Sequence, residues 1–262
     1  MQRVNLKPDT LDPENRRFAQ APLAQAVFLN SVPKAGSHLL RNIVRMFVPV
    51  SQQYQRQFVQ YANLEEHRDA FSETLPMLSW GHLPFSDSSA VELTGVRKIL
   101  LVRDPYNWVI ARARFFVSDE FDGNLDLLKA GKLTVEELMN VMIFGIYQRA
   151  PSMNEIYTHN AAAWLGTGVH LVRYEDVVGN LKAIESAEAQ TYFRELLNAC
   201  GIALPDDWQD RVRTGSDPAQ SGTARENLSA RPGLEFPGEL PETQRRLVEF
   251  AAPGLRQLLG YD

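Results

Sequence analysis

The chain has 262 residues, of which 44% are hydrophobic and 23% are charged, and its formal net charge at pH 7 is −5. This composition is that of an ordinary globular protein, and it excludes a mainly disordered, collagen-like or coiled-coil architecture. The single cysteine, Cys200, excludes an internal disulfide and a cysteine-based zinc site, so we expect it to be a buried, unreactive thiol.

The start of the sequence lacks the apolar stretch of a secretory signal peptide. The longest apolar stretch, residues 138–147, is far shorter than the roughly 20 residues that cross a membrane. We therefore expect a soluble, cytoplasmic protein with no membrane partner. The net acidity argues against a nucleic-acid partner, but residues 1–114 carry +4 and residues 115–262 carry −9, so a small anion would bind better to the first part.

The first 25 residues are predicted to form an irregular N-terminal arm because they contain three prolines, and residues 26–262 are predicted to form one domain. The apolar residues 26–30 predict a buried strand, and residues 32–36 a turn. Ser37 is the expected N-cap of a helix, since the apolar residues that follow it recur every three or four positions.

Later segments repeat this order of strand, loop and helix. Asp104 and Pro105 follow one apolar run and predict the N-cap and first residue of a helix. The predicted strands are residues 77–80, 97–103 and 169–173, and helical patterns follow in 106–117, 119–165 and 181–199. Strands separated by helices predict an α/β fold with a mostly parallel, doubly wound sheet. Residues 214–238, rich in Gly and Pro, predict a long functional flap or a disordered loop.

The loop after the first strand has the features of an anion site. A strand that turns through a glycine into a helix presents unpaired backbone N–H groups, and Lys34 adds a positive charge. The loop does not match the G-x-x-x-x-G-K-[ST] motif of NTPases, because its lysine precedes its only glycine. It is therefore of a phosphate-binding type but differs from an NTPase loop.

At this point the sequence resembles the sulfotransferases that use 3′-phosphoadenosine 5′-phosphosulfate (PAPS). The loop Pro33-Lys34-Ala35-Gly36-Ser37-His38-Leu39 is similar to their motif P-K-[SA]-G-[ST]-[ST]-[WL], with His38 in place of a hydroxyl residue. The resemblance implies that all seven residues bind the 5′-phosphosulfate, with Lys34 at the bridging oxygen.

Two further segments resemble motifs of the same family. Arg103-Asp104-Pro105 is similar to the start of R-D-P-x-D-x-x-x-S, which implies that Arg103 binds the 3′-phosphate. Asn107 replaces the second Asp of that motif, and Ala111 occupies the position of the phosphate-binding Ser. Arg112 and Arg114 could compensate for the lost hydroxyl or face water.

The segment Gly81-His82-Leu83-Pro84 is similar to T-H-L-P, with Gly for Thr, and implies that His82 is the catalytic base. A neutral imidazole can accept a proton at neutral pH. Residues 173–176 (RYED) and the ending LGYD also resemble family segments, and we interpret RYED as mainly structural. The family's cap, R-[RK]-G-x-x-G-x-W, is not matched in residues 221–233, where Arg225 is the candidate substitute.

The resemblance implies transfer of a sulfuryl group from PAPS to a hydroxyl, in preference to an amine, of a small molecule, with no metal. Lys34 would stabilise the departing phosphate and His82 would deprotonate the acceptor. The alternatives are a P-loop small-molecule kinase and an inactive sulfonucleotide-binding protein. Aromatic residues in 51–76 and 115–160 favour a partly apolar acceptor, and the sequence leaves the oligomeric state open.

Overall fold

The computed structural model describes residues 3–4, 10–56, 58–119, 121–122, 126–220 and 234–262. Within these residues, five parallel strands form the main sheet in the order β3-β4-β2-β5-β7. The strands are β2 (Val27–Ser31), β3 (Val59–Gln60), β4 (Leu78–His82), β5 (Arg97–Val102) and β7 (His170–Arg173). The predicted α/β fold with a parallel sheet is confirmed.

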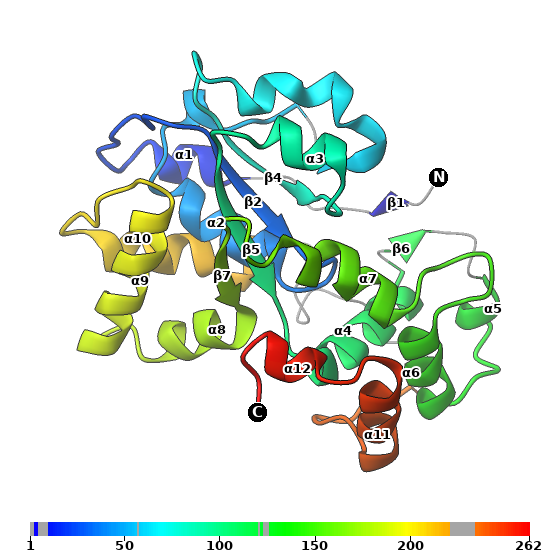
Figure 1. Ribbon diagram of the computed structural model, residues 1–262. Helices are drawn as coiled ribbons and strands as arrows, with labels where there is room; N and C mark the ends of the chain where they lie inside the picture. Colours follow the sequence, from blue (N-terminus) through cyan, green and yellow to red (C-terminus); the bar gives the residue numbers. More distant parts are fainter. Residues whose placement is uncertain (1–2, 5–9, 57, 120, 123–125, 221–233) are drawn as a thin grey trace.

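Helices cover both faces of this sheet, as expected for a doubly wound fold (Figure 1). Helix α10 packs on α2, whereas α6 packs on α4 and α11. The α-helices after β2 are α2 (Ser37–Arg45), α3 (Asp87–Glu92), α4 (Pro105–Val117), α5 (Asp126–Lys129), α6 (Val135–Phe144), α7 (Met153–Asn160), α8 (Tyr174–Lys182), α9 (Ala187–Ala199), α10 (Trp208–Ser216), α11 (Glu242–Ala251) and α12 (Leu255–Leu258). The 3-10 turns are η1 (Val50–Gln52), η2 (Tyr61–Asn63), η3 (Glu65–Phe71), η4 (Ala162–Trp164) and η5 (Pro218–Gln220).

The N-terminal arm is more regular than predicted. It contains α1 (Leu11–Asn15), and β1 (Arg3–Val4) pairs antiparallel with β6 (Phe121–Asp122). The helix tolerates Pro13 because this residue lies in its first turn, where a backbone N–H would have no helical partner. Asn15 is buried and donates two side-chain hydrogen bonds, to the carbonyls of Arg45, the last residue of α2, and of Val48, at 2.6 and 3.0 Å. The arm is thereby fixed to the domain.

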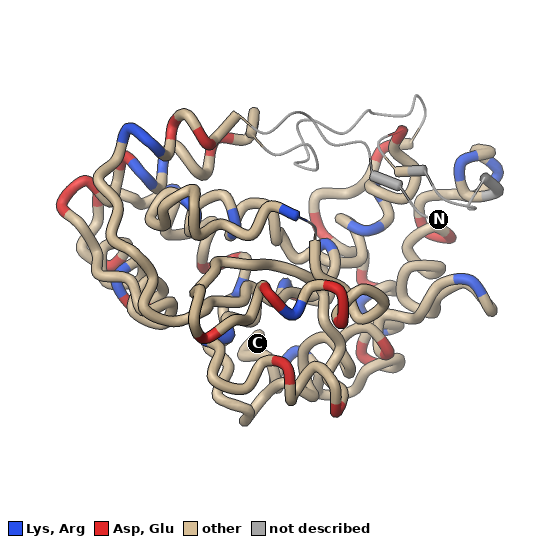
Figure 2. Tube along the Cα trace, turned by 90° about the horizontal axis from the view of Figure 1, so that it is seen from above, with Lys and Arg blue, Asp and Glu red and all other residues tan. Residues whose placement is uncertain are grey.

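The core lies on the two central strands. All five residues of β2 and the last four of β5 are buried, because helices cover both faces of these strands. Cys200 is buried, and burial raises the pKa of its thiol to about 12, which agrees with the expected unreactive thiol. In the residues described here, no helix is long and apolar enough to span a membrane. Figure 2 shows Lys and Arg interspersed with Asp and Glu along the described trace.

One predicted element boundary is wrong. Ser37 is the first residue of α2, and the N-cap is Gly36 at φ 101°, because the turn needs a left-handed residue directly before the helix. The helix expected within residues 181–199 is α9, and α8, which begins directly after β7, was not predicted. Of the predicted flap, residues 214–220 and 234–238 are described, whereas Arg225 lies outside the described residues.

Candidate functional site

The backbone of the loop between β2 and α2 requires particular residues at particular positions. Gly36 has a φ of 101°, and a Cβ there would lie less than 3.0 Å from the ring of Tyr174, so both the backbone and the packing require glycine. Lys34 has a φ of 69°, a conformation that is uncommon and costly outside glycine. The N–H groups of the first turn of α2, which follows this loop, have no partner within the helix.

Helix α4 supports this loop from one side. The buried Trp108 donates from Nε1 to the carbonyl of Pro33 at 2.6 Å, and the N–H of Ala35 closes the turn on Val32 at 3.0 Å. Trp108 therefore fixes the carbonyl of Pro33, and with it the position of the loop. The role of Trp108 in holding the loop depends on tertiary packing and leaves no local signal in the sequence.

Lys34 and Arg103 bring two positive charges together. The ammonium of Lys34 lies 3.6 Å from the ring centroid of Phe115, and within the described residues it forms no hydrogen bond or ion pair. Burial, and secondarily the charge of Arg103, lower the pKa of Lys34 to about 7. Two neighbouring cations that form no ion pair in the described part of the chain are an arrangement that an anion would stabilise.

Arg103 lies at the carboxyl end of β5 with its guanidinium 4.4 Å above the ring of Tyr174. Its Nε is buried and has no hydrogen-bond partner among the described residues. A buried donor without a partner is costly, and it marks a place where a ligand can accept the hydrogen bond. Tyr174, from the segment interpreted as structural, thus contacts both Arg103 and Gly36, and we add it to the site residues.

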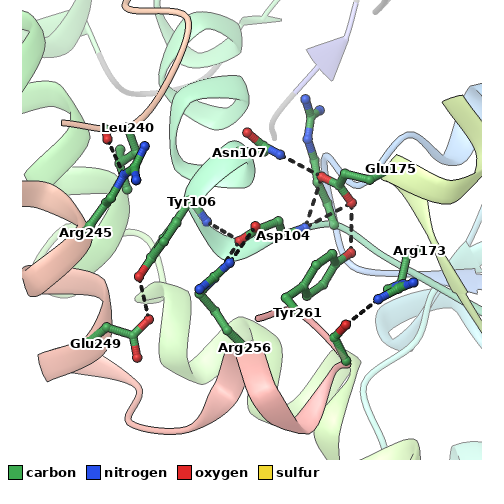
Figure 3. Close-up of polar contacts among 12 residues, drawn as sticks. Asp104, Tyr106, Asn107, Arg173, Glu175, Leu240, Arg245, Glu249, Arg256 and Tyr261 are labelled. Atoms are coloured by element: carbon green, nitrogen blue, oxygen red, sulfur yellow. Dashed lines mark hydrogen bonds and ion pairs between the residues drawn. The ribbon is translucent and has the colours of Figure 1, made fainter. Parts of the chain in front are cut away.

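Figure 3 shows the network that holds the turn after Arg103. Asp104 caps α4 by accepting from the N–H of Tyr106 at 3.0 Å, as predicted, and pairs with Arg256 through two contacts of 3.1 Å. Glu175 accepts from the N–H of Asp104 at 3.3 Å and from Asn107 Nδ2 at 2.9 Å. The family's aspartate at position 107 would place a second carboxylate against Glu175, so asparagine suits this network.

Ala111 on α4 lacks the hydroxyl of the family motif, and the neighbouring arginines of this helix form other contacts. Arg112 is buried and donates to the carbonyls of Met142 and Pro151 at 3.3 Å, so it is directed into the core. Arg114 donates to the carbonyl of Pro237 at 2.9 Å. The expectation that these arginines face water is therefore wrong for the buried Arg112, and within the described residues both are used in structural hydrogen bonds.

His82 ends β4 beside the lysine loop. Its Nδ1 lies 2.9 Å from the backbone carbonyl and 3.0 Å from the hydroxyl of Ser31. Because the carbonyl can only accept, a proton on Nδ1 satisfies this contact and leaves the lone pair on Nε2. Burial chiefly, and the charge of Lys34 in part, lower the pKa of His82 to about 4. The imidazole is thus neutral at physiological pH, in the tautomer that a general base needs.

The loop after His82 has its own support. Asn30 on β2 donates to the carbonyl of Leu83 at 3.0 Å and accepts from its N–H at 2.9 Å. Trp164 donates from Nε1 to the same carbonyl at 2.9 Å. These contacts fix the position of His82 relative to β2, and hence relative to the lysine loop that follows that strand.

A cavity lies beside Asp104. It has a volume of about 720 Å³ and lies between α4, α11 and α12. Each arginine that lines it is already paired: Arg245 with Glu239, Arg246 with Glu242, and Arg256 with Asp104. The lining holds five carboxylates against these three arginines, which disfavours an anion, and we place the anion site at Lys34 and Arg103.

No protein-family model matches the sequence, and no curated protein matches it in sequence. The structure is similar to that of mouse sulfotransferase SULT7A1 complexed with PAP (TM-score 0.56, 13% identity, 95% of this chain and 91% of that chain). It is also similar to retinol dehydratase in complex with androsterone and the inactive cofactor PAP (TM-score 0.53, 13% identity, 90% and 80%), and to retinol dehydratase in a complex with retinol and PAP (TM-score 0.51, 12% identity, 92% and 82%). The resemblance that the motifs indicated is confirmed at the level of the fold: this chain has the sulfotransferase fold.

Proposed function

We propose that the protein is a PAPS-dependent sulfotransferase that transfers the sulfuryl group to a hydroxyl of a small molecule. The observation that carries this proposal is the grouping of Lys34, the unpartnered Nε of Arg103 and the neutral His82 around one loop. Two cationic side chains from different strand ends suit a nucleotide with phosphates at both its 5′ and 3′ ends. The PAP in the titles of the similar structures supports this assignment.

In this proposal each side chain has a separate role. The N–H groups at the start of α2 and Ser37 hold the 5′-phosphate, and Lys34 stabilises the negative charge that develops on it as the sulfuryl group departs. Arg103 donates from Nε to the 3′-phosphate. His82 accepts the acceptor's proton at Nε2 while Ser31 holds its Nδ1–H. The remaining loop residues, Pro33, Ala35, Gly36, His38 and Leu39, would line the 5′ end.

Substitution of Lys34 and of His82 tests these roles. Turnover of PAPS is measured with a panel of hydroxyl acceptors, and binding of 3′-phosphoadenosine 5′-phosphate by calorimetry. Lys34→Ala should lower kcat about 10²- to 10³-fold and weaken nucleotide binding, because a preorganised cation is lost. His82→Ala should lower kcat about 10²- to 10⁴-fold and still bind the nucleotide. The exposed His159, replaced by Ala, is the control and should change neither quantity.

The other candidate functions give different outcomes in the same assays. Ala111 lacks the hydroxyl of the family motif, which favours an inactive nucleotide-binding protein as the second candidate. Tight nucleotide binding without turnover of any acceptor would support that candidate. Turnover that requires Mg²⁺ and ATP would instead support a kinase. Wild-type protein that binds no nucleotide would refute the proposal.

A further inference from the structure

The ammonium of Lys34 lies over the face of Phe115, a residue of α4 that the proposed mechanism does not use. Its Nζ is 3.6 Å from the ring centroid, which is a close cation–π contact. Phe115 is buried, so the contact is largely shielded from water. Since Lys34 forms no hydrogen bond or ion pair within the described residues, this ring face is the contact that stabilises its charge there.

One face of α4 holds Lys34 at two points. Trp108 and Phe115 are seven residues apart on this helix, which is about two turns, so they lie on the same face. Trp108 donates to the carbonyl of Pro33, the residue before Lys34, at 2.6 Å, and Phe115 contacts the ammonium. The same helix face therefore fixes both the backbone and the charged end of Lys34.

Two other rings fix the orientation of Phe115. Phe121 packs against it with the centroids 5.1 Å apart, and Phe116 meets it edge to face at 6.2 Å. Phe121 is buried and lies on β6, which pairs with β1. Because buried side chains are close-packed, these contacts leave the ring of Phe115 little freedom to turn its face away from Lys34.

The ring opposes two effects that disfavour the charge of Lys34. Burial first, and then the charge of Arg103, lower the pKa of Lys34 to about 7. Among the described residues, His82 is the other titratable group whose charge couples to Lys34, and it is neutral above about pH 4. An aromatic face attracts an ammonium through its quadrupole, whereas a neutral amine gains no such attraction. Phe115 therefore favours the charged form of the lysine.

We propose that Phe115 is a positioning residue whose ring face keeps the ammonium of Lys34 charged and in place before an anion binds. Its consequence for catalysis rests on the proposed function, but the state of Lys34 in the free protein does not. A ring that only excluded water would have the opposite effect, because its loss would admit water and raise the pKa of Lys34. Loss of a ring that holds the charge lowers this pKa, so the sign of the change separates the two roles.

The pKa of Lys34 can be measured in the free protein by NMR. The chain has six lysines, so protein labelled with carbon-13 lysine gives few Cε signals, and the signal that Lys34→Arg removes is that of Lys34. In the wild type its titration midpoint should lie at about pH 7. In Phe115→Leu the midpoint should fall by about one pH unit, because a desolvated cation–π contact is lost.

The neighbouring ring provides a matched control. Phe116→Leu removes an equally buried ring from the same cluster, but that ring lies against Arg112, at 5.1 Å, so the midpoint of Lys34 should not change. Phe115→Tyr keeps the ring face and should keep the wild-type midpoint. The other five lysines show in every spectrum whether a shift is confined to Lys34. If Phe115→Leu does not fold, Phe115→Met also lacks a ring and gives the same comparison.

Binding of 3′-phosphoadenosine 5′-phosphate gives a second readout, which depends on the proposed function. A bound phosphate keeps Lys34 charged, so the ratio of the Kd at pH 8 to the Kd at pH 5 reflects the pKa of Lys34 in the free protein. Measured by calorimetry, this ratio should be about tenfold larger in Phe115→Leu than in the wild type or in Phe116→Leu. A ring with a merely structural role would change both Kd values alike and leave the ratio unchanged.

An unchanged or raised midpoint of Lys34 in Phe115→Leu, or an equal fall in Phe116→Leu, would overturn the inference. A midpoint that falls in Phe115→Leu alone, in a protein that binds no nucleotide, would support the inference and refute the proposed function.

Discussion

At the scale of single residues, the site is defined by two positive charges that form no ion pair among the described residues. The charge of Arg103 acts on Lys34, whose backbone φ is 69°, and Arg103 keeps a buried Nε without a partner in the same part of the chain. A protein does not gain stability from such an arrangement, because burial and like-charge repulsion both oppose the charged form of lysine. The cost is offset when an anion binds, which is the physical reason to place the phosphates here.

The lowered pKa of Lys34 gives a pH dependence with a defined sign. In the free protein Lys34 is charged below about pH 7 and neutral above it. A bound phosphate raises this pKa, so binding above pH 7 takes up one proton, and the Kd of 3′-phosphoadenosine 5′-phosphate should rise about tenfold per pH unit between pH 7 and 9. Calorimetry across this range measures it. Lys34→Arg, which stays charged, should remove the dependence, whereas a flat profile in the wild type would contradict the lowered pKa.

At the scale of elements, two buried tryptophans hold two different loops. Trp108 on α4 donates to Pro33 in the lysine loop, and Trp164 on η4 donates to Leu83 after His82. Both are fully buried, and both use Nε1. Replacing each tryptophan by phenylalanine therefore removes the same donor, Nε1–H, from one loop at a time.

Trp108→Phe and Trp164→Phe should separate the two loops. Each leaves a carbonyl with one hydrogen bond fewer and should lower the free energy of unfolding by about 1–3 kcal/mol, measured by urea denaturation. Trp108→Phe should weaken nucleotide binding, because the lysine loop loses its support. Trp164→Phe should leave nucleotide binding intact and lower kcat through His82. The same loss of nucleotide affinity in both variants would show that the loops are not supported separately.

The helices and strands could be predicted from the sequence only where residues within or next to the element determine it. The pair Asp104-Pro105 sets the start of α4, and the apolar runs set β2 and β5, because caps and buried strands leave strong local signals. Strand β3 has only two residues and no apolar run, so it could not be found; it exists because Gly81 admits it. The N-cap at Gly36 was misplaced by one residue, because the turn geometry depends on the ring of Tyr174.

At the scale of the whole molecule, segments far apart in sequence position the site. Arg256 on α12 pairs with Asp104 at the end of β5, and both side chains are 14% exposed. Arg173 holds the carbonyl of Gly260, and Tyr261 donates to Glu175 at 2.8 Å. Lys34, His82 and Arg103 lie at or just after the carboxyl ends of β2, β4 and β5, which meet at one edge of the parallel sheet. The direction of Arg112 and the contacts of Tyr174 follow from tertiary packing alone.

Arg256 gives a prediction at this scale. Arg256→Ala leaves the carboxylate of Asp104 partly buried with one charge partner fewer, and it should lower the free energy of unfolding by about 2 kcal/mol in urea denaturation. Nucleotide affinity should also fall, because Arg103 directly precedes Asp104. Arg246→Ala is the control: its pair with Glu242 is exposed, so the change should stay within about 0.5 kcal/mol. Equal effects of the two substitutions would contradict this assignment.

The two tryptophan supports have a consequence for how such a protein can diversify. Trp108 on α4 holds Pro33, whereas Trp164 on η4 holds Leu83. Under the proposed function, mutations around Trp164 reshape the neighbourhood of His82 while the contact that holds the nucleotide loop stays intact. Descendants of one ancestor would then exchange one acceptor for another and keep the sulfuryl donor.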